Sequence, residues 1–90
     1  LFMFKPNSGI WKPQKGDKFS LDDLMDIEIF FKHDLASAKS DYTRWKAFTE
    51  KYPKLTQSKK GFKGMLEVCK RGILEAETNL RTVNELIKSI

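Results

Sequence analysis

The chain has 90 residues, of which 40% are hydrophobic and 32% charged, and its formal net charge is +5. Such a chain forms one small domain: it is too hydrophobic for a disordered tail and too polar for a membrane protein. No window approaches the roughly 18 uninterrupted apolar residues of a membrane-spanning helix. The single cysteine, Cys69, excludes an internal disulfide and favours a reducing, intracellular location, either cytoplasmic or nuclear.

Residues 1–16 are expected to form an extended N-terminal arm. Pro6 and Pro13 prevent a continuous helix, and the turn-forming residues 7–9 follow the first of them. The arm carries large apolar side chains that need a surface to pack on, among them Phe2, Phe4 and Trp11. Two interpretations stay open: the arm covers the chain's own first helix, or it docks on another protein.

A long helix is predicted over residues 20–52. Ser20 and Asp23 form a capping-box-like pair at its start, and Pro53 follows its end. The poor helix formers at 37–41 leave either one long helix or two shorter ones, and the unbroken phase of the apolar pattern favours one. That pattern, a first seam with spacings of three and four, consists of Leu24, Ile27, Phe31, Leu35, Ala38, Tyr42, Trp45, Phe48 and Tyr52.

A turn at 53–57 and a second helix at about 58–90 complete the predicted domain, residues 17–90. The second seam consists of Phe62, Leu66, Cys69, Ile73, Ala76, Leu80, Val83, Ile87 and Ile90. Because short connections make neighbouring helices antiparallel, the predicted fold is all-α, a long coiled-coil-like antiparallel hairpin. The chain begins with Leu1 and stops on a seam residue, which indicates a fragment or a processed chain.

Several large apolar residues lie off both seams and would be exposed in a two-helix hairpin, so a third packing layer is expected. They are Met25, Ile29, Phe30, Met65, Val68, Leu74 and Leu86. The third layer is either the arm, a second copy that completes a four-helix bundle, or a helix of a partner protein. The residues expected to make protein contacts are Phe2, Phe4, Trp11, Met25, Ile29 and Phe30.

Charge is unevenly distributed along the chain. Residues 44–71 hold nine basic and two acidic side chains, a net charge of +7, whereas residues 17–43 have a net charge of −4. The basic segment is interpreted either as a solvated loop region or as a site for nucleic-acid phosphates or an acidic protein. Its candidate anion-binding residues are Arg44, Lys51, Lys54, Lys59, Lys60, Lys63, Lys70 and Arg71.

The sequence offers little for catalysis. His33 has no second histidine or cysteine at ligand spacing, and no phosphate-binding loop or hydrolase motif is present. Residues 61–64 match the G-x-x-G loop of KH domains only superficially, because the strands of that fold are missing. We therefore expect no enzyme, cofactor, metal or small-molecule substrate. The primary hypothesis is a protein-interaction and assembly module with a protein partner or itself, and the alternative is nucleic-acid binding.

Overall fold

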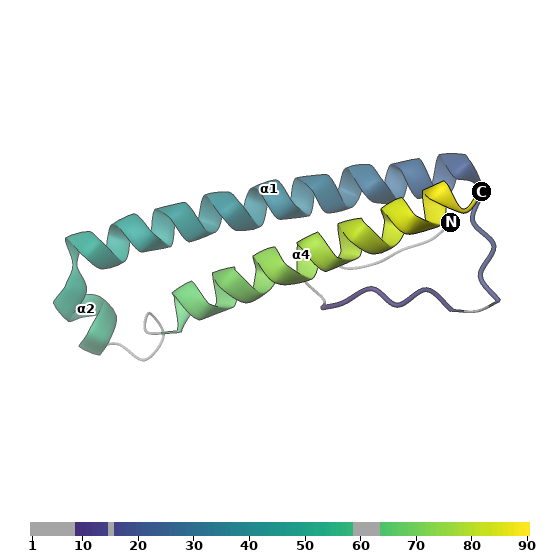
Figure 1. Cartoon of the computed structure of the whole chain (residues 1–90). Helices are drawn as coiled ribbons and strands as arrows, with labels where there is room; N and C mark the ends of the chain where they lie inside the picture. The colour runs from purple at the N-terminus through teal and green to yellow at the C-terminus, as the bar shows by residue number, and fades with distance from the viewer. Residues whose placement is uncertain (1–8, 15, 59–63) are drawn as a thin grey trace.

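The computed structural model describes residues 9–14, 16–58 and 64–90. Within these ranges the chain is mostly helical and has no strand, and its helices are α1 over Leu21–Lys51, α2 over Pro53–Ser58 and α4 over Met65–Lys88. The two long helices pack against each other as an antiparallel hairpin with overall extents of 51 × 20 × 18 Å (Figure 1). This arrangement confirms the predicted all-α hairpin.

Helix α1 begins at a complete capping box. The Ser20 side-chain oxygen accepts a hydrogen bond from the Asp23 N–H at 3.1 Å, and the Asp23 carboxylate accepts one from the Ser20 N–H at 3.2 Å. The helix then continues without a break through residues 37–41. Ala38, within that stretch, is buried against α4, so tertiary packing offsets the low helix propensity around it.

The connection between the long helices differs from the turn predicted at 53–57. Pro53 is instead the first residue of the short helix α2, a position that needs no backbone donor. The Thr56 hydroxyl donates to the carbonyl oxygens of Tyr52 and Pro53, both at 3.1 Å, and its side chain is buried. Of the second predicted helix, the described part begins at Met65, and residues 59–63 lie outside the described ranges.

The large core residues gather at the end of the hairpin that holds the start of α1 and the end of α4. Leu24, Ile27 and Phe31 of α1 pack there against Val83 of α4. These residues belong to the two predicted seams, so the periodicity located the core correctly. Both seams are buried over a shorter length than predicted. Tyr52, the last residue of the first seam, and Ile90, the last residue of the second, are exposed.

Small residues separate this core from the opposite end, where α2 lies. A Cβ built on Gly72 would lie 3.7 Å from the Ala38 Cβ, and Ala76 is fully buried between the helices. The helices therefore approach closely at mid-length. Toward α2 their axes diverge (Figure 1), and Trp45 and Ile73, two seam residues on that side of the core, are half-buried rather than buried.

Candidate functional site

The described part of the arm belongs to the chain's own fold. The Trp11 ring lies 5.6 Å from the Phe31 ring and 5.9 Å from the Phe19 ring, measured between centroids, and it packs against the core cluster. Trp11 therefore supplies part of the third layer. This contact supports the first interpretation of the arm, as a cover for its own helices.

Asn79 fixes the arm to α4, and sequence analysis missed it. Its Oδ1 accepts a hydrogen bond from the Trp11 backbone N–H at 2.7 Å, and its Nδ2 donates to the Gly9 carbonyl oxygen at 3.2 Å. The side chain is buried, and both polar ends are satisfied. In the sequence, Asn79 is only a polar residue next to the seam residue Leu80. That position does not indicate a hydrogen bond to the backbone of Trp11, 68 residues earlier.

The predicted protein-contact residues other than Trp11 fall into three groups. Phe30 is half-buried in a T-shaped contact with Phe31 and packs on the core. Met25 and Ile29 are exposed on α1. Phe2 and Phe4 lie outside the described residues.

Leu21 joins the two exposed residues in one row. Leu21, Met25 and Ile29 follow each other at spacings of four, so they lie on one side of α1, and their exposed fractions are 46%, 48% and 52%. We call these three residues the outer stripe. Leu21 was not among the residues predicted from sequence, because it falls at the capped helix start.

Of the basic candidates that the structure describes, two already have partners. Arg44 pairs with Asp41, and the Lys70 Nζ lies 3.6 Å from a Glu67 carboxylate oxygen. The other described candidates, Lys51, Lys54 and Arg71, are exposed. The predicted anion-binding residues Lys59, Lys60 and Lys63 lie outside the described ranges.

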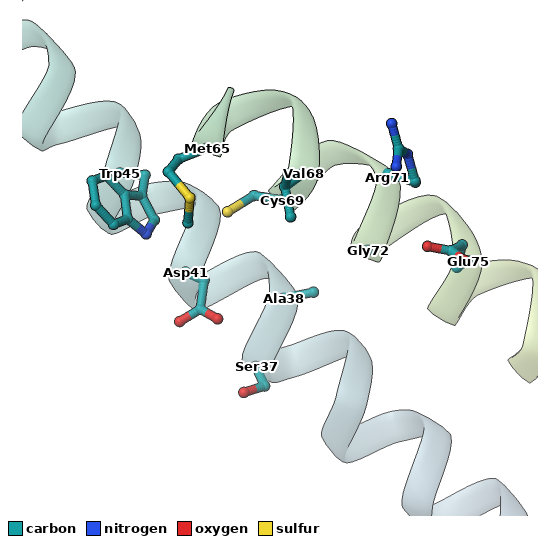
Figure 2. A pocket seen from close by; sticks show the side chains of 10 residues that line it. All are labelled: Ser37, Ala38, Asp41, Trp45, Met65, Val68, Cys69, Arg71, Gly72 and Glu75. Atoms are coloured by element: carbon teal, nitrogen blue, oxygen red, sulfur yellow. The ribbon is translucent and has the colours of Figure 1, made fainter. Parts of the chain in front are cut away.

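A pocket of about 280 Å³ opens between α1 and α4 on the α2 side of the close helix contact (Figure 2). We call it the tip pocket. Trp45, Met65 and Cys69 contribute apolar surface from the two helices, and Val68, 54% exposed, lies at its edge. The complete lining is Ser37, Ala38, Asp41, Trp45, Met65, Val68, Cys69, Arg71, Gly72 and Glu75.

One carboxylate of the pocket lining, Glu75, also lies beside the arm. Glu75 lines the pocket, and its Oε2 lies 3.3 Å from the position of a Cβ built on Gly9. Burial, together with the Glu75 charge, raises the pKa of the Asp34 carboxyl. Glu75 therefore lies both at the tip pocket and beside Gly9.

The Cys69 thiol faces the tip pocket from α4 (Figure 2). Burial, and secondarily the Asp41 carboxylate, raise the pKa of the thiol. The neutral thiol is therefore favoured at neutral pH, and Cys69 contributes to the pocket as a small apolar group.

The described ranges contain no cluster of three histidine, cysteine or acidic side chains that could hold a metal ion. In the same part of the chain, neither long helix has an apolar stretch sufficient to cross a membrane. No family model matches the chain, and no curated protein or solved structure is significantly similar to it. The two candidate sites, the outer stripe and the tip pocket, are therefore defined by this chain's own geometry.

Proposed function

We propose that the chain is a non-enzymatic protein-association module that binds a partner helix through the outer stripe. The observation that carries this proposal is the row of three large apolar side chains, each about half exposed, at four-residue spacing on α1. Such a row matches the anchor pattern with which a helix packs against another helix. The described part of the arm packs on Phe31 through Trp11, and Met25 and Ile29 are about half exposed.

Charge beside the stripe favours one kind of partner. Asp22 and Asp26 are exposed on the same part of α1, so a partner helix with an apolar face and basic flanks gains electrostatic attraction. A second copy of this chain brings the same carboxylates to the contact. A different protein therefore fits the stripe better than a homodimer, although pairing of two hairpins would produce the four-helix bundle considered from sequence.

Matched variants test this proposal. The pair Met25→Glu and Ile29→Glu places charge on the stripe, whereas Leu74→Glu changes a residue of α4 that is 62% exposed. We expect a protein captured by the parent and by Leu74→Glu to be lost with the double variant, and all three chains to retain their helical circular dichroism. Sedimentation velocity identifies the second copy as the partner if the parent self-associates. The proposal is contradicted if the parent chain is monomeric and the double variant still captures the same protein as the parent.

A second proposal is nucleic-acid binding by the basic end of the hairpin. Lys51 and Lys54 support it, because both are exposed close together at the junction of α1 and α2. If about five phosphates are contacted, the logarithm of the affinity for duplex DNA should fall with the logarithm of salt concentration at a slope near −4 to −5. Lys51→Glu with Lys54→Glu should make that slope shallower by about 2. Absence of binding at low salt contradicts this alternative.

A further inference from the structure

The hairpin already holds one non-helical segment of the chain against its own helices. Residues 9–11 lie there without helical structure, and the Trp11 side chain packs on Phe31 while Asn79 binds the backbone. The hairpin thus holds a non-helical segment through one large apolar side chain and through hydrogen bonds to its main chain. Glu75, which lines the tip pocket, also lies beside this segment, because its Oε2 is 3.3 Å from the position of a Cβ built on Gly9.

The size of the tip pocket suits one side chain. Its volume of about 280 Å³ lies at the lower limit of pockets that enclose small-molecule ligands, roughly 300 Å³. Its apolar surface comes from Trp45, Met65, Val68 and Cys69. A phenylalanine, leucine or methionine side chain of a peptide would therefore fit it better than a cofactor.

The charges at the pocket define a second requirement. Asp41 is paired with Arg44, whereas the pKa of the Asp34 carboxyl is raised by burial and, secondarily, by the charge of Glu75. Arg71 also lines the pocket, but its side chain extends away from α1 (Figure 2). A cation placed near Asp34 and Glu75 would relieve their repulsion.

We propose that the tip pocket binds an extended segment of another protein that carries a large apolar residue and, two positions away, a lysine or arginine. In an extended chain such residues point to the same side and lie about 7 Å apart, so one enters the pocket while the other reaches Glu75. This inference rests on the proposed function, association with proteins, but it uses a surface separate from the outer stripe.

Three capped pentapeptides serve as probes: Gly-Phe-Ser-Arg-Gly, its Arg-to-Glu counterpart and its Phe-to-Ala counterpart. Their binding to the whole chain is followed by two-dimensional ¹H–¹⁵N NMR. We expect the first peptide, at millimolar concentration, to shift the signals of Trp45, Val68 and Gly72. The glutamate peptide should bind about threefold to tenfold more weakly, because attraction is replaced by repulsion. The alanine peptide should bind at least about tenfold more weakly, because the buried ring is lost.

Matched variants locate the site. Val68→Asp should abolish binding, whereas Leu74→Asp, an exposed position on the same helix outside the pocket lining, should not. Glu75→Gln should remove most of the preference for the arginine peptide, and Glu77→Gln should retain it. Because Met25→Glu with Ile29→Glu should leave peptide binding unchanged, failure of this inference is distinguishable from failure of the outer-stripe proposal.

Four results would overturn the inference. They are no binding of the first peptide at millimolar concentration, signal shifts that cluster away from the pocket, equal effects of Val68→Asp and Leu74→Asp, and binding that appears only after residues 1–8 are deleted. The last result would assign the pocket to the chain's own N-terminal segment. If Val68→Asp were to lose its helical structure, the Glu75→Gln and Glu77→Gln pair would decide the outcome by itself.

Discussion

Asn79 of α4 accepts a hydrogen bond from the backbone N–H of Trp11 at 2.7 Å, and the same side chain donates to the carbonyl oxygen of Gly9. One buried amide therefore satisfies two main-chain groups of the arm. This contact determines which surface of the hairpin the arm covers. The described part of the arm packs on Phe31, and the outer-stripe residues Met25 and Ile29 and the pocket-edge residue Val68 are exposed.

Removing this clamp should detach the arm. Asn79→Ala leaves the Trp11 N–H and the Gly9 carbonyl without their partner, and we expect the free energy of unfolding to fall by about 1–3 kcal/mol. Urea unfolding measures this loss. Asn84→Ala, at a half-buried position of the same helix, is the control and should cost less. Equal stability of parent and Asn79→Ala would show that the clamp contributes nothing.

The Asp34 carboxyl should oppose folding at neutral pH. Its folded-state pKa is raised by burial and then by Glu75, so the folded chain holds this proton more tightly than the unfolded chain. Stability from this group is therefore greatest at low pH and falls as pH rises through the interval between the unfolded and folded pKa values. Asp34→Asn should stabilise the chain at pH 7 by a few tenths to about 1 kcal/mol.

Thermal unfolding of parent and variant across pH checks the Asp34 prediction. The stability difference should shrink as pH falls below that interval, because the parent carboxyl is then neutral in both states. Glu77→Gln, an exposed change on α4, should alter stability by less than about 0.5 kcal/mol. A destabilised Asp34→Asn variant would mean that the carboxylate has a favourable partner.

Cys69 should react slowly with thiol reagents. The side chain is buried, and burial together with Asp41 raises the pKa of its thiol, so both access and thiolate fraction are low at neutral pH. The rate of modification by Ellman's reagent should increase with pH and should rise strongly in denaturant. A rate at pH 7 equal to that of free cysteine would contradict the position of Cys69 between the helices.

Gly72→Ala should stabilise the chain. Gly72 lies inside α4, where glycine costs about 0.5–1 kcal/mol relative to alanine. The new Cβ would sit 3.7 Å from the Ala38 Cβ, an ordinary van der Waals contact, so we expect a gain of about 0.5–1 kcal/mol in urea unfolding. Ala76→Leu, at a fully buried position, should instead lose about 1–3 kcal/mol through overpacking. Destabilisation by Gly72→Ala would show that the helices lie closer than described.

The positions of the helix start and of the buried helix face follow from residues close together in the sequence, and these parts of the fold were predicted. The spacing of Leu24, Ile27 and Phe31 predicted the core face of α1, and Ser20 with Asp23 predicted its start. Pro53 was read only as the end of a helix, although proline is equally suited to the first turn of the next one. The helix α2 was missed for that reason.

The tip pocket and the arm contact depend on residues far apart in the chain, and periodicity carries little information about such contacts. A seam of uniform spacing does not reveal that Ala38 and Gly72 bring the helices close at mid-length while a pocket opens beside Trp45. Likewise, Asn79 had no local feature that indicated its binding to Gly9 and Trp11. By contrast, the pattern within α1 alone places Met25 and Ile29 off the packed seam, and both side chains are exposed.

Photo-crosslinking from the outer stripe tests the association proposal most directly. A benzophenone-bearing residue replaces Met25 in one chain and, as the control, Leu74 in another, since both positions are exposed on long helices. We expect irradiation in cell extract to produce one dominant adduct from position 25, with a distinct protein or with a second copy, that Ile29→Glu abolishes and position 74 does not form. Identical adducts from both positions, or none from position 25, would contradict the outer stripe as a docking surface.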